Sequence, residues 1–339
     1  LPIVFQSYKN EKVIITAMQS LSAWTKDAGQ IYKTTVDWDM DQQNFVMNGT
    51  TACDLARWPN NTDGDPFTLD SKRNTGGSNG DVITNAYLNS SEIPNYDWSK
   101  GGSVFFYGDK GGAGWTAWKS FITSSSAGKV VFDLNKNPSW IRTVHYPAAL
   151  GDFYLEGIKE AIDYQNEWFF DSATKTLYIQ LPGGVSPVDG QVKMRRRLLT
   201  VDLNGKNYIE IRNLAVFGGG IEISGSNNVL YGITSLYGNH SRGVVSGFSI
   251  NSQSVYFKYG SKNNSIEKSE VGFGAGAGIR DNGNNTQILN NYVHDFDYAG
   301  DYDAALYVRE GSGATVKGNT VTRAGRDAIQ IISKNSEVA

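Results

Sequence analysis

The segments NSIEKSEVGFGA (264–275), TQILNNYVHDFD (286–297) and ATVKGNTVTRAG (314–325) follow one pattern. Each carries an apolar anchor and a second apolar residue five positions later, and the segments 208–219 and 228–239 align with them. Consecutive anchors lie about 20 to 35 residues apart, which is typical of stacked coils whose turns differ in length. The first anchors are Ile211, Tyr231, Ile266, Ile288 and Val316, and the second are Val216, Leu236, Val271, Val293 and Val321.

This repeat predicts an all-β fold, a right-handed parallel β-helix. Short runs of Val, Ile, Tyr and Phe bounded by Gly and Asn recur along the chain, and 38 glycines against 8 prolines fit a turn-rich β protein. Coils of a β-helix stack about 4.8 Å apart, so that equivalent inward residues form apolar ladders. We therefore expect the anchors to make up the core.

A long segment rich in Trp, Gly and Asp interrupts the repeat near the N-terminus. We expect the first β-helix strands at 1–25, a β-rich insertion with hairpins at 26–196, and parallel β-helix coils at 197–339. Within the insertion, EWFFDSATKTLYIQLPGG (167–184) predicts a hairpin of two aromatic strands. The sequence begins and ends in apolar strands, so we expect further C-terminal coils or a partner chain to cap the β-helix.

The composition argues against several classes of function. The 339 residues carry 34 acidic and 31 basic side chains, for a formal charge of −3, so nucleic acid is not an expected partner. No apolar stretch approaches the roughly 20 residues of a membrane span. Cys53 is the single cysteine, which excludes an internal disulfide and a cysteine metal cluster. Phosphate-loop, nucleophile-elbow and His-Glu-x-x-His motifs are also absent from the sequence.

Several segments together resemble a known superfamily. These are PIVFQSYKNEKVIIT (2–16), LARWPN (55–60), the hairpin at 167–184, and rungs such as NNYVHDF (290–296) and GNTVTRAGRDAIQI (318–331). They are similar to the bacterial right-handed parallel β-helix superfamily of carbohydrate-active enzymes, which includes glycoside hydrolases and polysaccharide lyases. The resemblance covers most of the chain and implies a secreted or periplasmic protein that acts on glycans, without specifying one activity.

The stretch HDFDYAGDYDAALYVREG (294–311) gathers the candidate catalytic carboxyls. Carboxyls about 5 to 5.5 Å apart suit a retaining glycosidase and those about 6.5 to 9.5 Å apart an inverting one. Both separations are available from neighbouring positions of a strand or of stacked rungs. Two alternatives stay open, a calcium site at Asp301 and Asp303, or aspartates that only form turns. The candidate catalytic residues are Asp295, Asp297, Asp301, Asp303 and Glu310.

Arginine and acid pairs on neighbouring coils are the candidate substrate contacts. Aligning 275–282 with 303–311 predicts that Arg280 and Asp281 stack on Arg309 and Glu310. Guanidinium groups in such a column could hold acidic or hydroxyl-rich sugars, whereas the simpler interpretation is a surface salt-bridge ladder. The candidate substrate-binding residues are Arg280, Asp281, His294, Arg309, Arg326 and Asp327.

The leading hypothesis is a secreted glycoside hydrolase that cleaves a polysaccharide or oligosaccharide bound along the outer face of the β-helix with paired carboxylates. No cofactor is required in this hypothesis, although the aspartates leave room for Ca²⁺. One alternative is a polysaccharide lyase that cleaves a uronate-containing glycan by β-elimination, with or without calcium. Another is a non-catalytic glycan-binding β-helix. The pool of basic residues for the lyase is Arg280, Arg309, Arg326 and Lys317.

Overall fold

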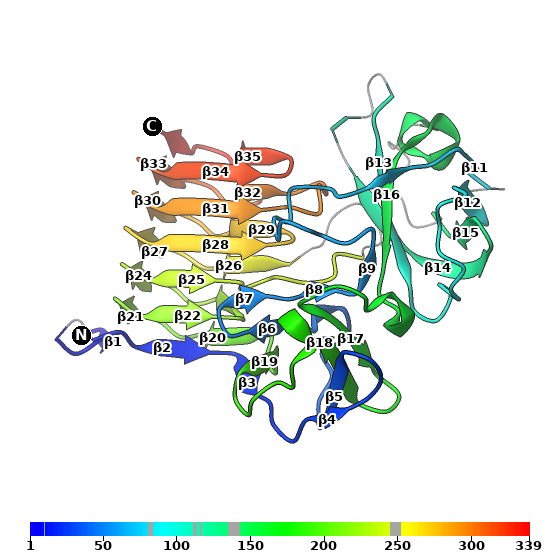
Figure 1. The fold of residues 1–339 in the computed structure, drawn as a ribbon. Coiled ribbons are helices and arrows are strands. Elements are labelled where there is room, and N and C mark those ends of the chain that lie inside the picture. The colour runs from blue at the N-terminus through cyan, green and yellow to red at the C-terminus, as the bar shows by residue number, and fades with distance from the viewer. Residues whose placement is uncertain (10, 81–83, 111–113, 116, 135–142, 245–251) are drawn as a thin grey trace.

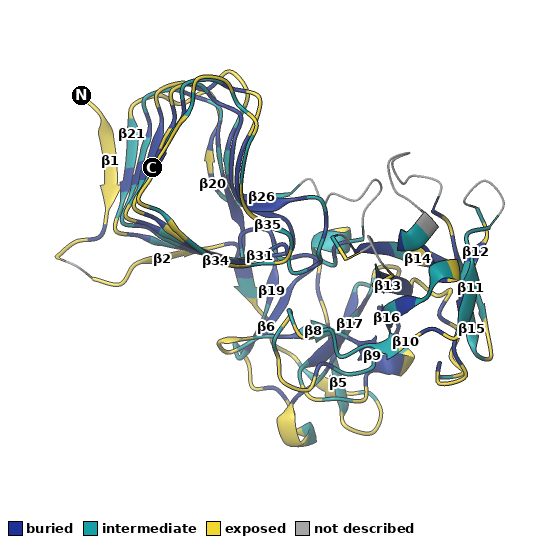
Figure 2. Cartoon of the chain, turned by 90° about the horizontal axis from the view of Figure 1, so that it is seen from above, coloured by how far each residue is buried: buried dark blue, intermediate teal, exposed yellow. Residues whose placement is uncertain are grey.

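The computed structural model spans residues 1–339 and describes all of them except 10, 81–83, 111–113, 116, 135–142 and 245–251. Its body is a parallel β-helix of three sheets, and the insertion packs against one corner of it (Figures 1 and 2). The described residues contain no α-helix. Their helical elements are short 3₁₀ turns: η1 (Asp41–Gln43), η2 (Thr143–His145), η3 (Pro147–Ala149), η4 (Lys159–Ala161) and η5 (Pro182–Gly184). No described helix is long and apolar enough to cross a membrane.

The three sheets of the β-helix are parallel throughout, and each coil contributes one strand to each of them. The first sheet consists of β1 (Ile3–Gln6), β21 (Ile209–Arg212), β24 (Val229–Tyr231), β27 (Ser265–Glu267), β30 (Gln287–Leu289), β33 (Thr315–Lys317) and β36 (Glu337–Val338). The second consists of β2 (Ile14–Thr16), β22 (Ala215–Phe217), β25 (Thr234–Leu236), β28 (Glu270–Gly274), β31 (Tyr292–Phe296) and β34 (Thr320–Ala324). The third consists of β20 (Leu199–Leu203), β23 (Gly220–Ile223), β26 (Gln253–Phe257), β29 (Ala277–Asp281), β32 (Ala304–Val308) and β35 (Asp327–Ile331).

Stacked apolar side chains fill the β-helix, as the repeat predicts. Ile266, Ile288 and Val316 lie in register on successive strands of the first sheet and are buried. In the rung before them the predicted anchor Tyr231 is wrong by one residue, because Leu230 pairs with Ile266. The same slip replaces the predicted Leu236 by Ser235 in the second sheet. A shift of one residue moves a side chain to the opposite face of a strand, so these two predictions are also wrong about burial.

Asparagines make the turns between the third and first sheets. Asn227, Asn263 and Asn285 all have φ between 52° and 59°, the left-handed region that asparagine tolerates better than most residues. The asparagines that follow them bond from coil to coil. The backbone N–H of Asn228 donates to Oδ1 of Asn264 at 2.9 Å, and the Asn264 amide donates to the carbonyl of Gly225 at 2.9 Å. Buried backbone groups at this corner are thereby satisfied.

The insertion consists of three further sheets. One holds β3 (Met18–Ser20), β19 (Val192–Arg195), β6 (Val46–Asn48) and β7 (Thr51–Ala52). The next holds β4 (Thr25–Lys26), β5 (Ile31–Thr35), β18 (Thr176–Gln180), β17 (Glu167–Asp171) and β8 (Asp54–Leu55). The last holds β9 (Arg57–Trp58), β10 (Lys72–Arg73), β16 (Gly151–Glu156), β13 (Ser103–Gly108), β14 (Trp118–Ser126), β15 (Lys129–Phe132), β12 (Ala86–Asn89) and β11 (Gly76–Ser78).

The predicted hairpin is confirmed as β17 and β18, which pair antiparallel with Phe169 opposite Tyr178. The chain leaves the β-helix after β2 and returns to it at β20. At this point β3 and β19 run antiparallel to each other, and the N–H of Arg196 donates to the carbonyl of Ala17 at 2.8 Å. The insertion therefore begins and ends at one place on the β-helix, and it has apolar clusters of its own around Trp98, Trp118 and Trp168.

Candidate functional site

Three of the predicted catalytic aspartates, Asp297, Asp301 and Asp303, lie together in the turn between β31 and β32, and all three are fully buried. The N–H of Asp301 donates to Oδ1 of Asp297 at 2.9 Å. Oδ2 of Asp297 and both carboxyl oxygens of Asp301 have no hydrogen-bond partner among the described residues. Burial raises the pKa of Asp297 and of Asp301 well above the ordinary range, and the neighbouring carboxyls raise it further. Burial in this turn thus favours the uncharged form of both carboxyls.

A calcium site at Asp301 and Asp303 stays a prediction. Among the residues that the structure describes, no group of three or more His, Cys, Asp or Glu is arranged to hold a metal ion.

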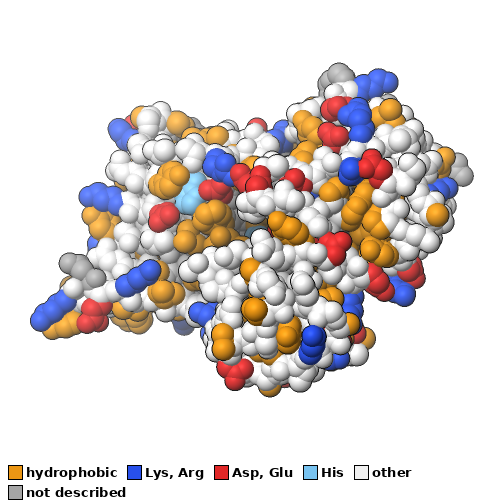
Figure 3. Space-filling model, in the orientation of Figure 1, with side chains coloured by type: hydrophobic (Ala, Val, Ile, Leu, Met, Phe, Trp, Pro, Cys, Tyr) orange, Lys and Arg blue, Asp and Glu red, His pale blue; other side chains and the backbone are white. Residues whose placement is uncertain are grey.

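Asp295 and His294 lie apart from that turn, on the outer face of the second sheet. Nδ1 of His294 is 2.7 Å from Oδ2 of Asp295, and its Nε2 is 3.3 Å from Oε1 of Glu270. Arg323 on the next coil binds Asp295 and also donates to Oδ1 of Asp65 in the insertion at 2.6 Å. The Arg323 guanidinium lowers the pKa of Asp65. This ionic chain links the β-helix to the loop at 59–70. Figure 3 shows acidic and hydrophobic side chains gathered where the two parts of the molecule meet.

The predicted stacking on the third sheet is wrong by two residues. Arg280 pairs in register with Tyr307, and Asp281 with Val308. A slip of two residues keeps the face of the strand, so Arg280 and Arg309 still flank one ring, with guanidinium carbons 5.4 and 5.8 Å from the centre of Tyr307.

Asp281 is buried and turns inward, where it accepts the N–H of Gly283 at 2.9 Å and the hydroxyl of Thr286 at 2.8 Å. Its contacts are those of a turn-capping residue.

The remaining predicted residues pair with their neighbours in the chain. Arg309 and Glu310 are both about half exposed and lie 3.9 Å apart, which fits a weak surface pair. Arg326 donates to Asp327 at 2.7 Å, and its guanidinium carbon lies 3.9 Å from the ring centre of Tyr302. Glu310 is exposed to solvent, whereas Asp297, Asp301 and Asp303 are buried.

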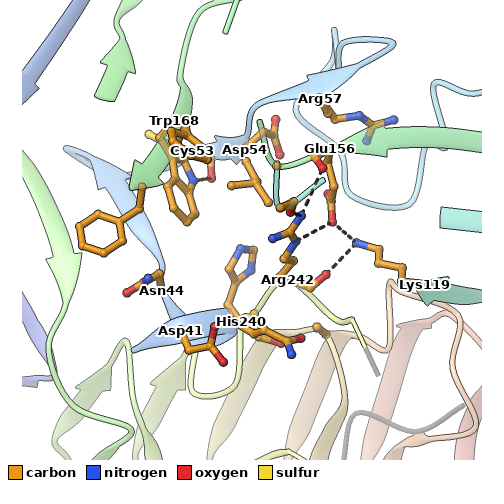
Figure 4. A pocket seen from close by; sticks show the side chains of 18 of the residues that line it. Asp41, Asn44, Cys53, Asp54, Arg57, Lys119, Glu156, Trp168, His240 and Arg242 are labelled. Atoms are coloured by element: carbon orange, nitrogen blue, oxygen red, sulfur yellow. Dashed lines mark hydrogen bonds and ion pairs between the residues drawn. The ribbon is translucent and has the colours of Figure 1, made fainter. Parts of the chain in front are cut away.

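A pocket of about 410 Å³ lies between the insertion and the corner of the β-helix (Figure 4). Its volume falls within the range of about 300 to 1,000 Å³ of small-molecule sites. The insertion forms most of the wall, with strands β8, β9, β14, β16 and β17 and the loops beside them. The β-helix contributes the segments 240–242 and 298–299, so that the pocket ends close to the turn that holds the buried aspartates.

A buried ion pair crosses this pocket. Nζ of Lys119 donates to Oε1 of Glu156 at 3.2 Å and to the carbonyl of Arg242 at 2.9 Å. Arg242 in turn donates to the carbonyls of Gly101 and Glu156, and its Nε is 3.9 Å from Oε1 of Glu156. Burial acts to lower the pKa of Lys119, but Glu156 and Tyr154 together outweigh it, so the net shift is upward. Glu156 is thus held between two cations.

Asp54 is a second carboxyl in the pocket. Unlike Glu156, it forms no ion pair within 4.0 Å among the described residues. Burial raises its pKa to about 6, and the charge of Glu156 adds to the rise, while Arg57 and a hydrogen bond with Asn61 work against it. Arg57 itself is occupied by the loop above it, where it donates to the carbonyls of Pro59, Leu69 and Asp70. Asp54, with its raised pKa, and the ion-paired Glu156 therefore share the pocket, and paired carboxyls in one pocket are candidates for acid–base catalysis.

The sequence analysis missed these pocket residues because they come from separate strands of the insertion. One signal was present. Lys119 in AWKSFI (117–122) and Glu156 in FYLEGI (153–158) each place a single charge within an apolar segment. Charged side chains are seldom fully buried unless they are paired, so two such charges could have been matched with each other.

Comparisons with known proteins were made against families, curated sequences and solved structures. No protein-family model matches the sequence. No curated protein matches it either. A structure described as "Glycoside hydrolase" superposes with a TM-score of 0.66 at 11% identity, over 94% of this chain and 67% of its own. The complex of XylC with xylose superposes with a TM-score of 0.40 at 12% identity, over 99% of this chain and 54% of its own. The tailspike protein gp49 from Pseudomonas phage LKA1 superposes with a TM-score of 0.19 at 12% identity, over 79% of this chain and 38% of its own. The first likeness shows the fold alone, and the other two scores are too low to show it.

Proposed function

We propose that the chain is a glycoside hydrolase whose catalytic site is the pocket between the insertion and the β-helix. The observation that supports this most is the pair of carboxyls in one pocket, Asp54 with a pKa raised to about 6 and Glu156 held by Lys119 and Arg242. Glycoside hydrolysis generally needs one carboxyl that carries a proton and one that does not.

In this mechanism Asp54 is the general acid. It gives its proton to the glycosidic oxygen as the bond from that oxygen to the anomeric carbon breaks. Glu156 is the second carboxylate, either as the base that takes a proton from the attacking water or as the nucleophile that attacks the anomeric carbon. The Lys119 ammonium keeps Glu156 oriented.

The pocket mouth offers an apolar surface for a sugar ring. Phe121 is 40% exposed there, with the guanidinium carbon of Arg242 5.0 Å from its ring centre. Sugar rings present C–H groups that pack on aromatic side chains. A saccharide would therefore lie against Phe121 with its scissile bond deeper in the pocket.

A polysaccharide lyase would need a free basic group as proton acceptor. In the pocket Lys119 and Arg242 are both engaged with Glu156. Outside it, Arg309, Arg326 and Lys317 each lie within 4.0 Å of an acidic side chain. Arg280, the fourth residue of the predicted pool, packs against the rings of Tyr256 and Tyr307. Hydrolysis is proposed ahead of β-elimination because two carboxyls share the pocket. Secretion and independence from a cofactor stay predictions.

The test is a screen of neutral and acidic glycans, read for reducing ends and for the ultraviolet absorbance of unsaturated uronates in the same samples. Reducing ends without absorbance are expected. Asp54→Asn and Glu156→Gln should each lower kcat by about 10²- to 10⁴-fold, while Asp301→Asn keeps activity. Unsaturated product would establish the lyase, and binding without any product would favour a glycan-binding β-helix.

A second readout separates chemistry from folding. Aryl glycosides with a good leaving group need little acid assistance, so Asp54→Asn should lose far less activity on them than on the natural glycan. Asp37→Asn, whose side chain is 77% exposed, is the matched control. Equal losses on both substrates would remove Asp54 from the role of general acid.

A further inference from the structure

His240 is clamped by aromatic rings at the wall of the pocket. It follows β25, and its imidazole centre lies 4.3 Å from the ring of Phe45, 5.5 Å from Tyr298 and 5.9 Å from Tyr237. The side chain lines the pocket beside Arg242 (Figure 4). Packing on several sides leaves the ring little freedom to rotate.

Tyr298 decides which ring nitrogen carries the proton. Its hydroxyl lies in hydrogen-bond contact with Nδ1 of His240, and it has no other hydrogen-bond partner among the described residues. Burial raises the pKa of Tyr298 well above its ordinary value, so the hydroxyl keeps its proton. If Nδ1 also carried a proton, the hydroxyl would have no acceptor. The hydroxyl therefore donates to Nδ1, and the imidazole proton is on Nε2.

The surroundings of the ring also keep it neutral. A guanidinium N–H of the buried Arg195 donates to the backbone carbonyl of His240, and the Lys119 ammonium is the second nearby cation. Burial, followed by these two charges, lowers the pKa of His240 to about 3. Arg195 and Lys119 thus both disfavour a positive charge on the ring. Nε2 of His240 has no hydrogen-bond partner among the residues that the structure describes.

We propose that His240 is a fixed, neutral hydrogen-bond donor that recognises a saccharide oxygen in the pocket through Nε2–H, with Tyr298 as the positioning residue. The ligand class rests on the proposed function, whereas the tautomer does not. Because the ring brings no positive charge, it favours a hydroxyl or ring oxygen over a carboxylate. The group that meets His240 is therefore an uncharged oxygen, and the neutral sugars are the ligands to test.

Nuclear magnetic resonance of the ¹⁵N-histidine-labelled chain tests the tautomer directly. The chain has only three histidines, so His240→Asn identifies the ring signals. The expected result is a protonated Nε2 and an unprotonated Nδ1 that do not change between pH 5 and 8. Titration of the ring within that range, or a proton on Nδ1, would overturn the proposal even if the chain proves to be an active hydrolase.

The ligand class is tested by adding glucose, galactose, xylose or glucuronate to the same sample. At least one neutral sugar should shift the Nε2 signal, and a response to glucuronate alone would overturn the neutral class. Tyr298→Phe should weaken the binding of that sugar by about twofold to tenfold and allow the second tautomer to appear. Tyr259→Phe, at 74% exposure, should change neither. A Tyr298→Phe variant with unchanged tautomer and affinity would remove the positioning role.

If hydrolysis is absent but a sugar still shifts Nε2, then only the proposed function fails. If hydrolysis occurs and no sugar shifts it, then the recognition role of His240 fails.

Discussion

Replacing Asp301 by Asn should stabilise the protein at neutral pH and leave it unchanged at pH 4. The carboxyl is fully buried, neither oxygen has a hydrogen-bond partner among the described residues, and its pKa is raised well above the ordinary value. The folded state therefore holds a proton that the unfolded state releases from about pH 4 upward. Stability is full below the ordinary pKa and falls as the pH rises toward the raised one. Asparagine fills the same space without this penalty.

The size of the effect follows from proton linkage. Each pH unit between the ordinary and the raised pKa lowers the free energy of unfolding by about 1.4 kcal/mol for one proton. The difference between variant and wild type therefore grows with every pH unit in that interval. For a chain of 339 residues, unfolding entropies of about 2.1 cal/mol/K per residue convert about 1.4 kcal/mol into a Tm difference of about 2 °C for each pH unit.

The assay is differential scanning calorimetry of both proteins from pH 4 to 8, with Asp37→Asn as an exposed control. A Tm difference that is the same at every pH would refute the reasoning, because linkage requires it to grow. Loss of glycan hydrolysis with no gain in Tm would show instead that Asp301 meets the substrate.

Three further predictions concern the pocket, the loop above it and the coil-to-coil bonds. The kcat/KM of the wild type should fall above about pH 6 as Asp54 loses its proton, and a pH–rate profile that stays flat from 5 to 8 would contradict the assignment. Arg323→Gln should free the loop that Asp65 anchors and speed limited proteolysis at 62–64 by at most about fivefold, since a surface ion pair contributes about 0 to 1 kcal/mol. Unchanged cleavage at low salt would show that the ion pair does not hold the loop. Asn264→Ala should lower stability by about 1 to 3 kcal/mol because the buried N–H of Asn228 loses its acceptor. A change in Tm below 1 °C on calorimetry would contradict this.

Much of the fold could be predicted from the sequence because the repeat reflects the stacking of apolar side chains from coil to coil. Ile266, Ile288 and Val316 must occupy equivalent positions if each coil is to bury one residue above the last. The repeat is weakest where a half-buried aromatic residue neighbours the true anchor, as Tyr231 neighbours Leu230. The predicted pairing of Arg280 with Arg309 is wrong by two residues. The turns before the two strands, at 275–276 and 297–303, differ in length, and the spacing of apolar residues does not reveal this.

The candidate site was less predictable, since carboxyl-rich turns look alike in sequence whether they face substrate or the interior. Asp297 and Asp301 are fully buried in a turn that the insertion contacts, where the N–H of Ala117 donates to the carbonyl of Gly300. The pocket carboxyls Asp54 and Glu156 are about a hundred residues apart in the chain and share no motif. Their proximity depends on how three small sheets assemble, which local patterns do not determine.

The neighbouring start and end of the insertion have an architectural consequence. Since Ala17 and Arg196 are joined by a backbone hydrogen bond, the insertion behaves as a cassette that can lengthen, shorten or be exchanged without shifting the register of any coil. The β-helix then supplies the constant wall of the pocket, and the insertion supplies the wall that can vary. Grafting a different cassette at these two residues would be a route to new specificity on an unchanged scaffold.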